Sequence, residues 1–153
     1  MMRQHLPKVS ESWKDWHLHG VLAGTLLTGI GLWLWNAPGF ARYLASDYWQ
    51  LVGFLLVYPA FEEWLFRGEL QGRLLRRGVF RRRHLGITRA NALTTAVFGL
   101  LHLIHQSHPL ALSVAIPSLI LGHFRERYGN LYLPVGLHAL FNATYLVAGL
   151  VQA

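Results

Sequence analysis

Long apolar stretches without a charged side chain alternate along this sequence with short, strongly charged segments. Residues 20–35 carry no charge and end in aromatic residues, which are common where a helix meets a membrane surface. Only 14% of the side chains are charged, whereas roughly 25% is usual in soluble proteins. The pattern therefore predicts that lipid, and not water, surrounds much of the chain.

Five apolar segments are candidates for membrane-spanning helices. They are residues 20–35, 48–66, 90–104, 110–124 and 131–151. The fifth can cross a hydrocarbon core of about 30 Å at about 1.5 Å per residue, whereas the fourth contains Pro117 and is expected to kink there. We therefore expect an all-α, polytopic membrane bundle of about five helices. It forms a single domain over residues 1–153, with its motif-bearing core at about residues 48–151.

The first apolar segment has an alternative interpretation as the core of a signal peptide. The residues after it, NAPGFARYLASDYW, contain no convincing small-x-small cleavage site directly after the apolar run. We therefore expect this segment to be retained as a helix.

The basic residues give the predicted bundle an orientation. With five spans, residues 1–19, 67–89 and 125–130 share one side of the membrane and hold thirteen of the fourteen Lys and Arg, which leaves only Arg42 on the other side. The excess of positive charge places the amino terminus in the cytoplasm. The seven arginines of residues 73–89 are expected to contact anionic lipid headgroups, an interpretation preferred to nucleic-acid binding.

Two adjacent glutamates, Glu62 and Glu63, end the second apolar segment. A charge inside a membrane costs about 2.5 to 3.5 kcal/mol on insertion scales, so the pair needs an explanation. One explanation is that both carboxylates lie in headgroup water. In the other, Glu63 pairs with Arg67 four residues later, while Glu62 points about 100° away and stays available. Because partial burial raises the proton affinity of a carboxylate, Glu62 is then a candidate general base.

Two further polar pairs lie within apolar segments. In FGLLH, Phe98 and His102 share a helix face, and in HALFN, His138 and Asn142 do the same. Each pair could simply form hydrogen bonds between helices. Their positions along the predicted spans, however, allow both histidines and Glu62 to converge in the cytoplasmic half of the bilayer. The sequence thus predicts one shared site.

Metal and serine chemistry find little support in the sequence. His105 and His108 follow His102 at a spacing that can bind zinc, but no HExxH motif occurs and the glutamates lie on another segment. The absence of cysteine excludes a thiolate site and a cysteine nucleophile. Ser113 and Ser118 lie in no recognisable nucleophile motif. We expect no metal and no cofactor.

The motifs EEWLFR, FGLLH and HALFN resemble, in this order, the EExxxR, FxxxH and HxxxN/D motifs of the CAAX protease and bacteriocin-processing family, also called the Abi family. The resemblance covers roughly residues 50–145. It implies a glutamic-type intramembrane peptidase in which Glu62 and His102 activate a water molecule. His138 and Asn142 would form the oxyanion hole.

The same resemblance assigns Glu63 and Arg67 the task of holding the geometry of the site. Members of the family are often longer, so this chain looks minimal and is similar to short members dedicated to carboxy-terminal tail sorting. The resemblance implies a membrane-anchored peptide or protein as substrate. In a bacterial chain this would be a bacteriocin leader or a sorting tail, cleaved at the cytoplasmic membrane of a bacterium or archaeon.

Two other functions stay open. A non-catalytic protein of the same fold, such as a bacteriocin-immunity or scaffolding protein, would use the residues from Glu62 to Asn142 as a structural polar network. A small proton-coupled transporter would instead relay protons through Glu62, His102 and His138.

Overall fold

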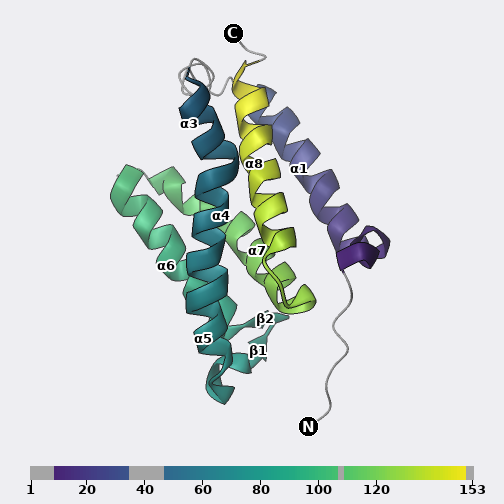
Figure 1. The fold of residues 1–153 in the computed structure, drawn as a ribbon, viewed down its shortest axis with the longest axis vertical. Helices are drawn as coiled ribbons and strands as arrows, with labels where there is room; N and C mark the ends of the chain where they lie inside the picture. The colour runs from purple at the N-terminus through teal and green to yellow at the C-terminus, as the bar shows by residue number, and fades with distance from the viewer. Residues whose placement is uncertain (1–8, 35–46, 107–108, 151–153) are drawn as a thin grey trace. The chain divides into compact units, whose positions relative to one another are not determined.

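The computed structural model describes residues 9–34, 47–106 and 109–150, and most of these residues are helical (Figure 1). The predicted all-α fold is confirmed. A hairpin of two short strands, β1 (Arg83–His84) and β2 (Ile87–Thr88), accompanies the helices. The helical elements in chain order are η1 (Val9–Lys14), α1 (Trp16–Leu34), α3 (Tyr48–Val52), η2 (Gly53–Val57), α4 (Tyr58–Glu63), η3 (Trp64–Gln71), α5 (Gly72–Leu75), η4 (Gly78–Arg81), α6 (Arg89–Gln106), η5 (Pro109–Val114), α7 (Ala115–Tyr128) and α8 (Tyr132–Leu150).

The observed helices follow the predicted apolar segments with one extension. Helices α1, α6 and α8 match the first, third and fifth segments to within a few residues. The second segment, predicted to end at residue 66, continues as helix to Leu75. The reason is that Arg67 and Gln71, which follow it, are fully buried and hydrogen-bonded to α7, so tertiary contacts maintain the helix beyond its apolar part.

Pro117 follows a change of helix type in the helical run of residues 109–128, and the kink predicted there stays a prediction. The 3₁₀-helix η5 ends at Val114, and α7 begins at Ala115. Pro117 thus lies in the first turn of α7, where backbone N–H groups have no partner within the helix. A proline costs little at such a position, because the hydrogen bond that it cannot donate would not form anyway.

The helical run from Tyr48 to Leu75 contains two π-helical stretches, η2 and η3. In a π-helix each N–H bonds to the carbonyl five residues earlier, and such turns are rare and frequently found at functional sites. The eight residues of η3 begin directly after Glu63. The sequence does not predict this geometry, because the apolar pattern of the run fits an α-helix equally well.

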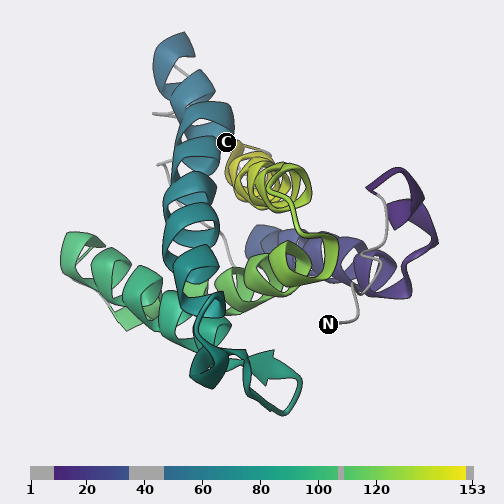
Figure 2. The same ribbon diagram turned by 60° about the horizontal axis from the view of Figure 1, so that its bottom comes forward.

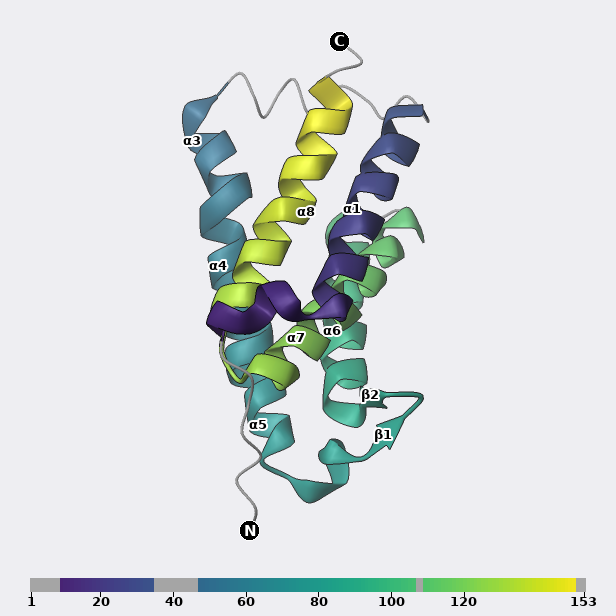
Figure 3. The same ribbon diagram turned by 90° about the vertical axis from the view of Figure 1, so that its right-hand side faces the viewer.

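The chain forms two compact units. The first unit comprises residues 1–60 and 136–153. Within it, α8 lies next to both α1 and the run formed by α3 and η2 (Figures 1 and 3). Leu146 of α8 packs against Leu51, Phe54 and Leu55. Helix α1 approaches α8 so closely that a Cβ atom added to Gly29 would lie 2.7 Å from the Thr144 methyl group.

The second unit comprises residues 61–135. Within it, α6 packs against α7, η5 and η3, and the crossing of these helices is visible in Figure 2. A Cβ atom on Gly122 of α7 would lie only 2.0 Å from Asn91 Oδ1 of α6. The Asn91 amide uses this close approach to donate to the Leu119 carbonyl over 2.9 Å. The prediction of a single domain over the whole chain stays a prediction.

One described helix, α8, is apolar enough and long enough to cross a membrane by length and composition, with nineteen residues and a mean hydropathy of 1.4. The other described helices do not meet this criterion. The set of five spans predicted from the sequence therefore stays a prediction.

Substituting Gly122 tests the close approach of α6 and α7. The Gly122→Ala change forces Asn91 away from the Leu119 carbonyl or separates the helices, and we expect it to lower stability by about 1 to 3 kcal/mol. Gly99→Ala on α6 is the matched control, because its Cβ would make an ordinary 3.8 Å contact with Leu112. The control should stabilise the helix slightly. Thermal unfolding in detergent micelles gives both values, and equal shifts for the two variants would contradict the predicted packing.

Candidate functional site

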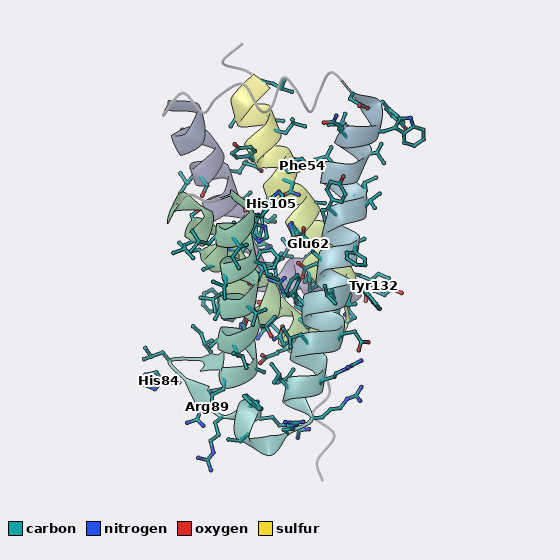
Figure 4. The ribbon with its side chains drawn as sticks, turned by 90° about the vertical axis from the view of Figure 1, so that its left-hand side faces the viewer. Phe54, Glu62, His84, Arg89, His105 and Tyr132 are labelled. Atoms are coloured by element: carbon teal, nitrogen blue, oxygen red, sulfur yellow. The ribbon has the colours of Figure 1, made fainter. Side chains whose placement is uncertain are left out.

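The two adjacent glutamates have different surroundings. Glu63 is completely buried, and its Oε1 accepts a hydrogen bond of 3.0 Å from Nη1 of Arg67, which is equally buried. The ion pair predicted from the four-residue spacing is thus present. Glu62 is only partly buried and lies on the side of α4 turned toward α6 (Figure 4). Its charge also attracts the Arg67 guanidinium, although less strongly than that of Glu63.

Arg67 is held from a second side by α7. Its Nη2 donates to the carbonyl of Ser118 over 3.1 Å and to Ser118 Oγ over 2.8 Å. The Ser118 hydroxyl lies 3.0 Å from Oγ1 of Thr95 on α6, and Thr95 donates in turn to Asn91. These side chains are all buried, so their hydrogen bonds replace water and fix η3 against both α6 and α7.

A second set of polar contacts continues the network toward the hairpin. Gln71 Nε2 donates to the Gly122 carbonyl over 3.1 Å and to Glu126 Oε1 over 2.8 Å. Glu126 also accepts a hydrogen bond from the Thr88 hydroxyl. The side chain of Arg125 donates to the backbone carbonyl of Arg67 over 3.2 Å.

The three motifs do not include these supporting residues, although the sequence contains a signal for them. Gln71 follows Arg67 by four residues, and the latter follows Glu63 by four, so the three side chains recur at a helical spacing. On α6, Asn91 and Thr95 precede His102 at spacings that also place them near one helix face. Polar residues repeated along one face of an apolar helix indicate a buried polar seam.

Phe98 joins the first two motifs physically. Its ring, only 4% exposed, lies 5.0 Å below the Arg67 guanidinium carbon. Phe66 packs its ring against the same aromatic, with centroids 4.9 Å apart and nearly perpendicular planes. His102 contacts it from another direction, with a centroid separation of 4.3 Å. The phenylalanine of FGLLH therefore links the buried arginine to the histidine of its own motif.

The hydrogen bond of His102 determines where its ring carries a proton. Nδ1 lies 3.0 Å from the backbone carbonyl oxygen of Phe98. A carbonyl only accepts hydrogen bonds, so Nδ1 must carry the hydrogen in this contact. In the neutral ring the lone pair is then on Nε2, which can accept a hydrogen bond from water. The side chain is partly exposed, so such an approach is open.

The third motif lies on α8. Asn142 Nδ2 donates to the carbonyl of Phe54 in η2 over 2.8 Å, and both residues belong to the first unit (Phe54 is labelled in Figure 4). A carboxamide nitrogen has two hydrogens, so this bond leaves a second N–H that can donate elsewhere. His138, one turn earlier, is partly buried. The two residues thus share a helix face, as predicted.

The structure brings only part of the predicted site into direct contact. Glu63, Arg67 and His102 form one connected cluster through Phe98, and Glu62 joins it through its attraction to the arginine. These residues lie in the second unit, whereas His138 and Asn142 lie in the first. Their convergence with Glu62 stays a prediction.

The residues considered for other chemistry lie elsewhere. Within the described ranges, no three His, Asp or Glu side chains are grouped so that they could hold a metal ion. His105 is exposed in the last turn of α6 (Figure 4), and His108 lies outside the described residues. Ser118 is 1% exposed and occupied by its bonds to Arg67 and Thr95, so its role is structural.

Comparison with known proteins supports the motif-based resemblance. The family model described as type II CAAX prenyl endopeptidase, Rce1-like, matches residues 44–144, a range that contains all six predicted site residues. The resemblance inferred from the three motifs is therefore confirmed. No curated protein and no solved structure matches the chain.

The buried ion pair can be tested against an exposed pair of the same spacing. Arg67→Met leaves the Glu63 charge buried without its counter-charge and should cost about 3 to 5 kcal/mol of stability. Adding Glu63→Gln removes that charge, so the double variant should lose less than the sum of the two single losses. Denaturant unfolding measures each free energy.

The control is Arg73→Met, which breaks the exposed pair with Glu69, also four residues apart. We expect that change to cost no more than about 1 kcal/mol. Strict additivity of the Glu63 and Arg67 changes would show that the two charges do not depend on each other.

Proposed function

Because the chain belongs to the Rce1-like family of type II CAAX prenyl endopeptidases, we propose that it is an intramembrane endopeptidase that uses Glu62 and His102 to hydrolyse a membrane-anchored peptide or protein. The family consists of integral membrane proteases that act on membrane-anchored proteins. The observation that carries the proposal is the buried cluster of Glu63, Arg67 and Phe98, which adjoins both Glu62 and His102.

In this proposal the chain crosses the membrane about five times, with its amino terminus in the cytoplasm and its arginine-rich segment, residues 73–89, facing anionic headgroups. The length and hydropathy of α8 support one of these spans. Further support comes from large apolar side chains that the described helices leave exposed, which is costly in water. They include Leu26, Leu27 and Ile30 of α1, Leu56 and Val57 of η2, Leu100, Leu101 and Ile104 of α6, and Ile116 of α7.

The first chemical step is the attack of water on the scissile carbonyl carbon. Glu62 removes a proton from the water, while Nε2 of His102 accepts a hydrogen bond from its second hydrogen and orients it. The carbonyl C–O π bond breaks as the new C–O bond forms, so a tetrahedral intermediate with one negatively charged oxygen results.

The second step expels the amine. His138 and the second N–H of Asn142 donate to the negatively charged oxygen, which lowers the energy of the intermediate. Glu62 then gives its proton to the nitrogen of the leaving group, the C–N bond breaks, and a carboxylic acid and an amine are released. All groups that act in these two steps, apart from substrate and water, are side chains of this chain.

Glu63, Arg67 and Ser118 support the reacting pair without contacting substrate. The guanidinium is fixed by three hydrogen bonds and packs on Phe98, which in turn packs on His102. Because these groups are buried, their positions change little when substrate binds. A displacement of about 1 Å at such a site is sufficient to lower the rate by about 10²-fold.

Cleavage by the reconstituted protein tests the mechanism. In proteoliposomes with a prenylated CAAX peptide, and separately with a peptide anchored by an acyl chain, Glu62→Gln and His102→Ala should each lower kcat/KM by about 10² to 10⁴-fold. The double variant should lose hardly more than either single variant, because both residues act on one water. The more efficiently cleaved peptide identifies the preferred anchor.

Neighbouring residues of the same types provide the controls. Glu69→Gln and His105→Ala alter exposed side chains outside the cluster and should leave kcat/KM unchanged. If Glu62→Gln and His102→Ala both retained full cleavage while folding normally, the glutamate–histidine mechanism would be wrong. Cleavage that a chelator abolishes and zinc restores would instead favour a metal-dependent mechanism.

A further inference from the structure

The short hairpin between α5 and α6 has an unusual residue at its tip. Strands β1 and β2 pair Arg83 with Thr88 and His84 with Ile87, so only Leu85 and Gly86 form the turn. Both have positive φ angles, 50° and 81°. Two-residue turns of this kind favour Asn, Asp or Gly at the first position. A leucine there is strained, because its Cβ crowds the backbone.

The strain at Leu85 is not offset by packing of its side chain within the fold. Its side chain is 89% exposed, and the neighbouring apolar side chains of Val79 and Ile87 are exposed as well. Strain held at an exposed site is typical of functional positions. An exposed apolar side chain at the tip is energetically favourable where the medium around the protein is itself apolar.

Arginines are frequent in the segment that carries this apolar tip. The segment of residues 73–89 contains seven of them. Within the described residues, only Arg73 and Arg83 form ion pairs with carboxylates, with Glu69 and Glu126 respectively. The other five therefore present an excess of positive charge, which matches a surface of negatively charged phosphates. His84 and Arg89 extend away from the helices in Figure 4.

The hairpin is fixed to the helices that follow it. Thr88 donates to Glu126 of α7 and accepts from the backbone N–H of Asn91 over 2.9 Å. The N–H of Arg89 donates to the carbonyl of Arg82 over 3.0 Å and closes the base of the hairpin. The base of the hairpin is thus held in place, which reduces the conformational freedom that the backbone of the tip loses on binding.

We propose that this hairpin binds the anionic phospholipid surface of the membrane, with Leu85 inserted at the boundary between headgroups and acyl chains and the arginines on the phosphates. An acidic protein segment would satisfy the arginines but would leave Leu85 in water, so lipid is the better match. The inference rests on the proposed membrane location of the chain and not on its peptidase chemistry.

The absence of cysteine makes a direct test possible. Leu85→Cys introduces a single thiol, which is labelled with an environment-sensitive fluorophore in nanodiscs of phosphatidylcholine, with or without phosphatidylglycerol. We expect a blue-shifted emission and strong quenching by a lipid-attached quencher only in the anionic discs. Adding Arg76→Gln, Arg77→Gln and Arg82→Gln should weaken this insertion by about fivefold per arginine.

A label at Leu100→Cys on the exposed side of α6 is the matched control, because it should be quenched equally in both lipids. If the tip label gave the same emission in both discs, the hairpin proposal would be overturned. Quenching of the label at position 100 would then show that α6 lies in the membrane even though the hairpin does not insert. A tip label that responds to an acidic peptide but not to anionic lipid would likewise overturn the proposal.

The Leu85→Asn variant tests whether the Leu85 side chain contributes to the stability of the fold. Asparagine suits the turn better than leucine, so the melting temperature in detergent should stay equal or rise. A clear loss of thermal stability would show that Leu85 packs within the fold, and would count against insertion into lipid.

Discussion

Glu63 and Arg67 are two opposite charges removed from water. Other residues of the unit formed by residues 61–135 provide the hydrogen-bond acceptors that the buried arginine needs. A buried guanidinium has five N–H donors and needs acceptors for them. One carboxylate oxygen satisfies only one, so Ser118 of α7 supplies two more acceptors. The ring of Phe98 on α6 covers a face of the same group. The packing of α6 and α7 is therefore arranged around a single cation.

This arrangement gives Phe98, four positions before the histidine of the second motif, two structural roles. Phe98 receives the cation on its ring, while its backbone carbonyl accepts the Nδ1 hydrogen of His102. One residue thus fixes both the position of the ring and the nitrogen that carries the proton. A smaller apolar side chain at this position would preserve the carbonyl but lose the contact with the arginine. In the proposed mechanism, the position of the His102 ring depends on the Phe98 carbonyl and on the packing of the Phe98 ring against Arg67.

The sequence predicted the parts of the fold that depend on local spacing. The apolar segments gave the helices, and the four-residue spacing gave the ion pair of Glu63 with Arg67. It did not predict the partners of Arg67 on α7, because contacts between residues 51 positions apart depend on how helices cross. It also did not predict the change from 3₁₀-helix to α-helix two residues before Pro117. The leucine turn of the hairpin was also missed, because turn preferences point to asparagine or glycine there.

The π-helical geometry of η3 makes the length of this segment less constrained than the length of the α-helices. Hydrogen bonds that reach back five residues accommodate an additional residue relative to an α-helix, as if one amino acid had been inserted after Glu63. Deleting a single residue between Gly68 and Gln71 would allow the segment to relax to α-helical geometry. Gln71 would then stay close to its present orientation toward Glu126, because the π-helical turn holds one extra residue and its removal leaves the residues that follow in register. Natural relatives with intact motifs should therefore be able to lose one residue within η3, whereas the loss of one residue from an α-helix such as α6 would turn every later side chain of that helix to another face.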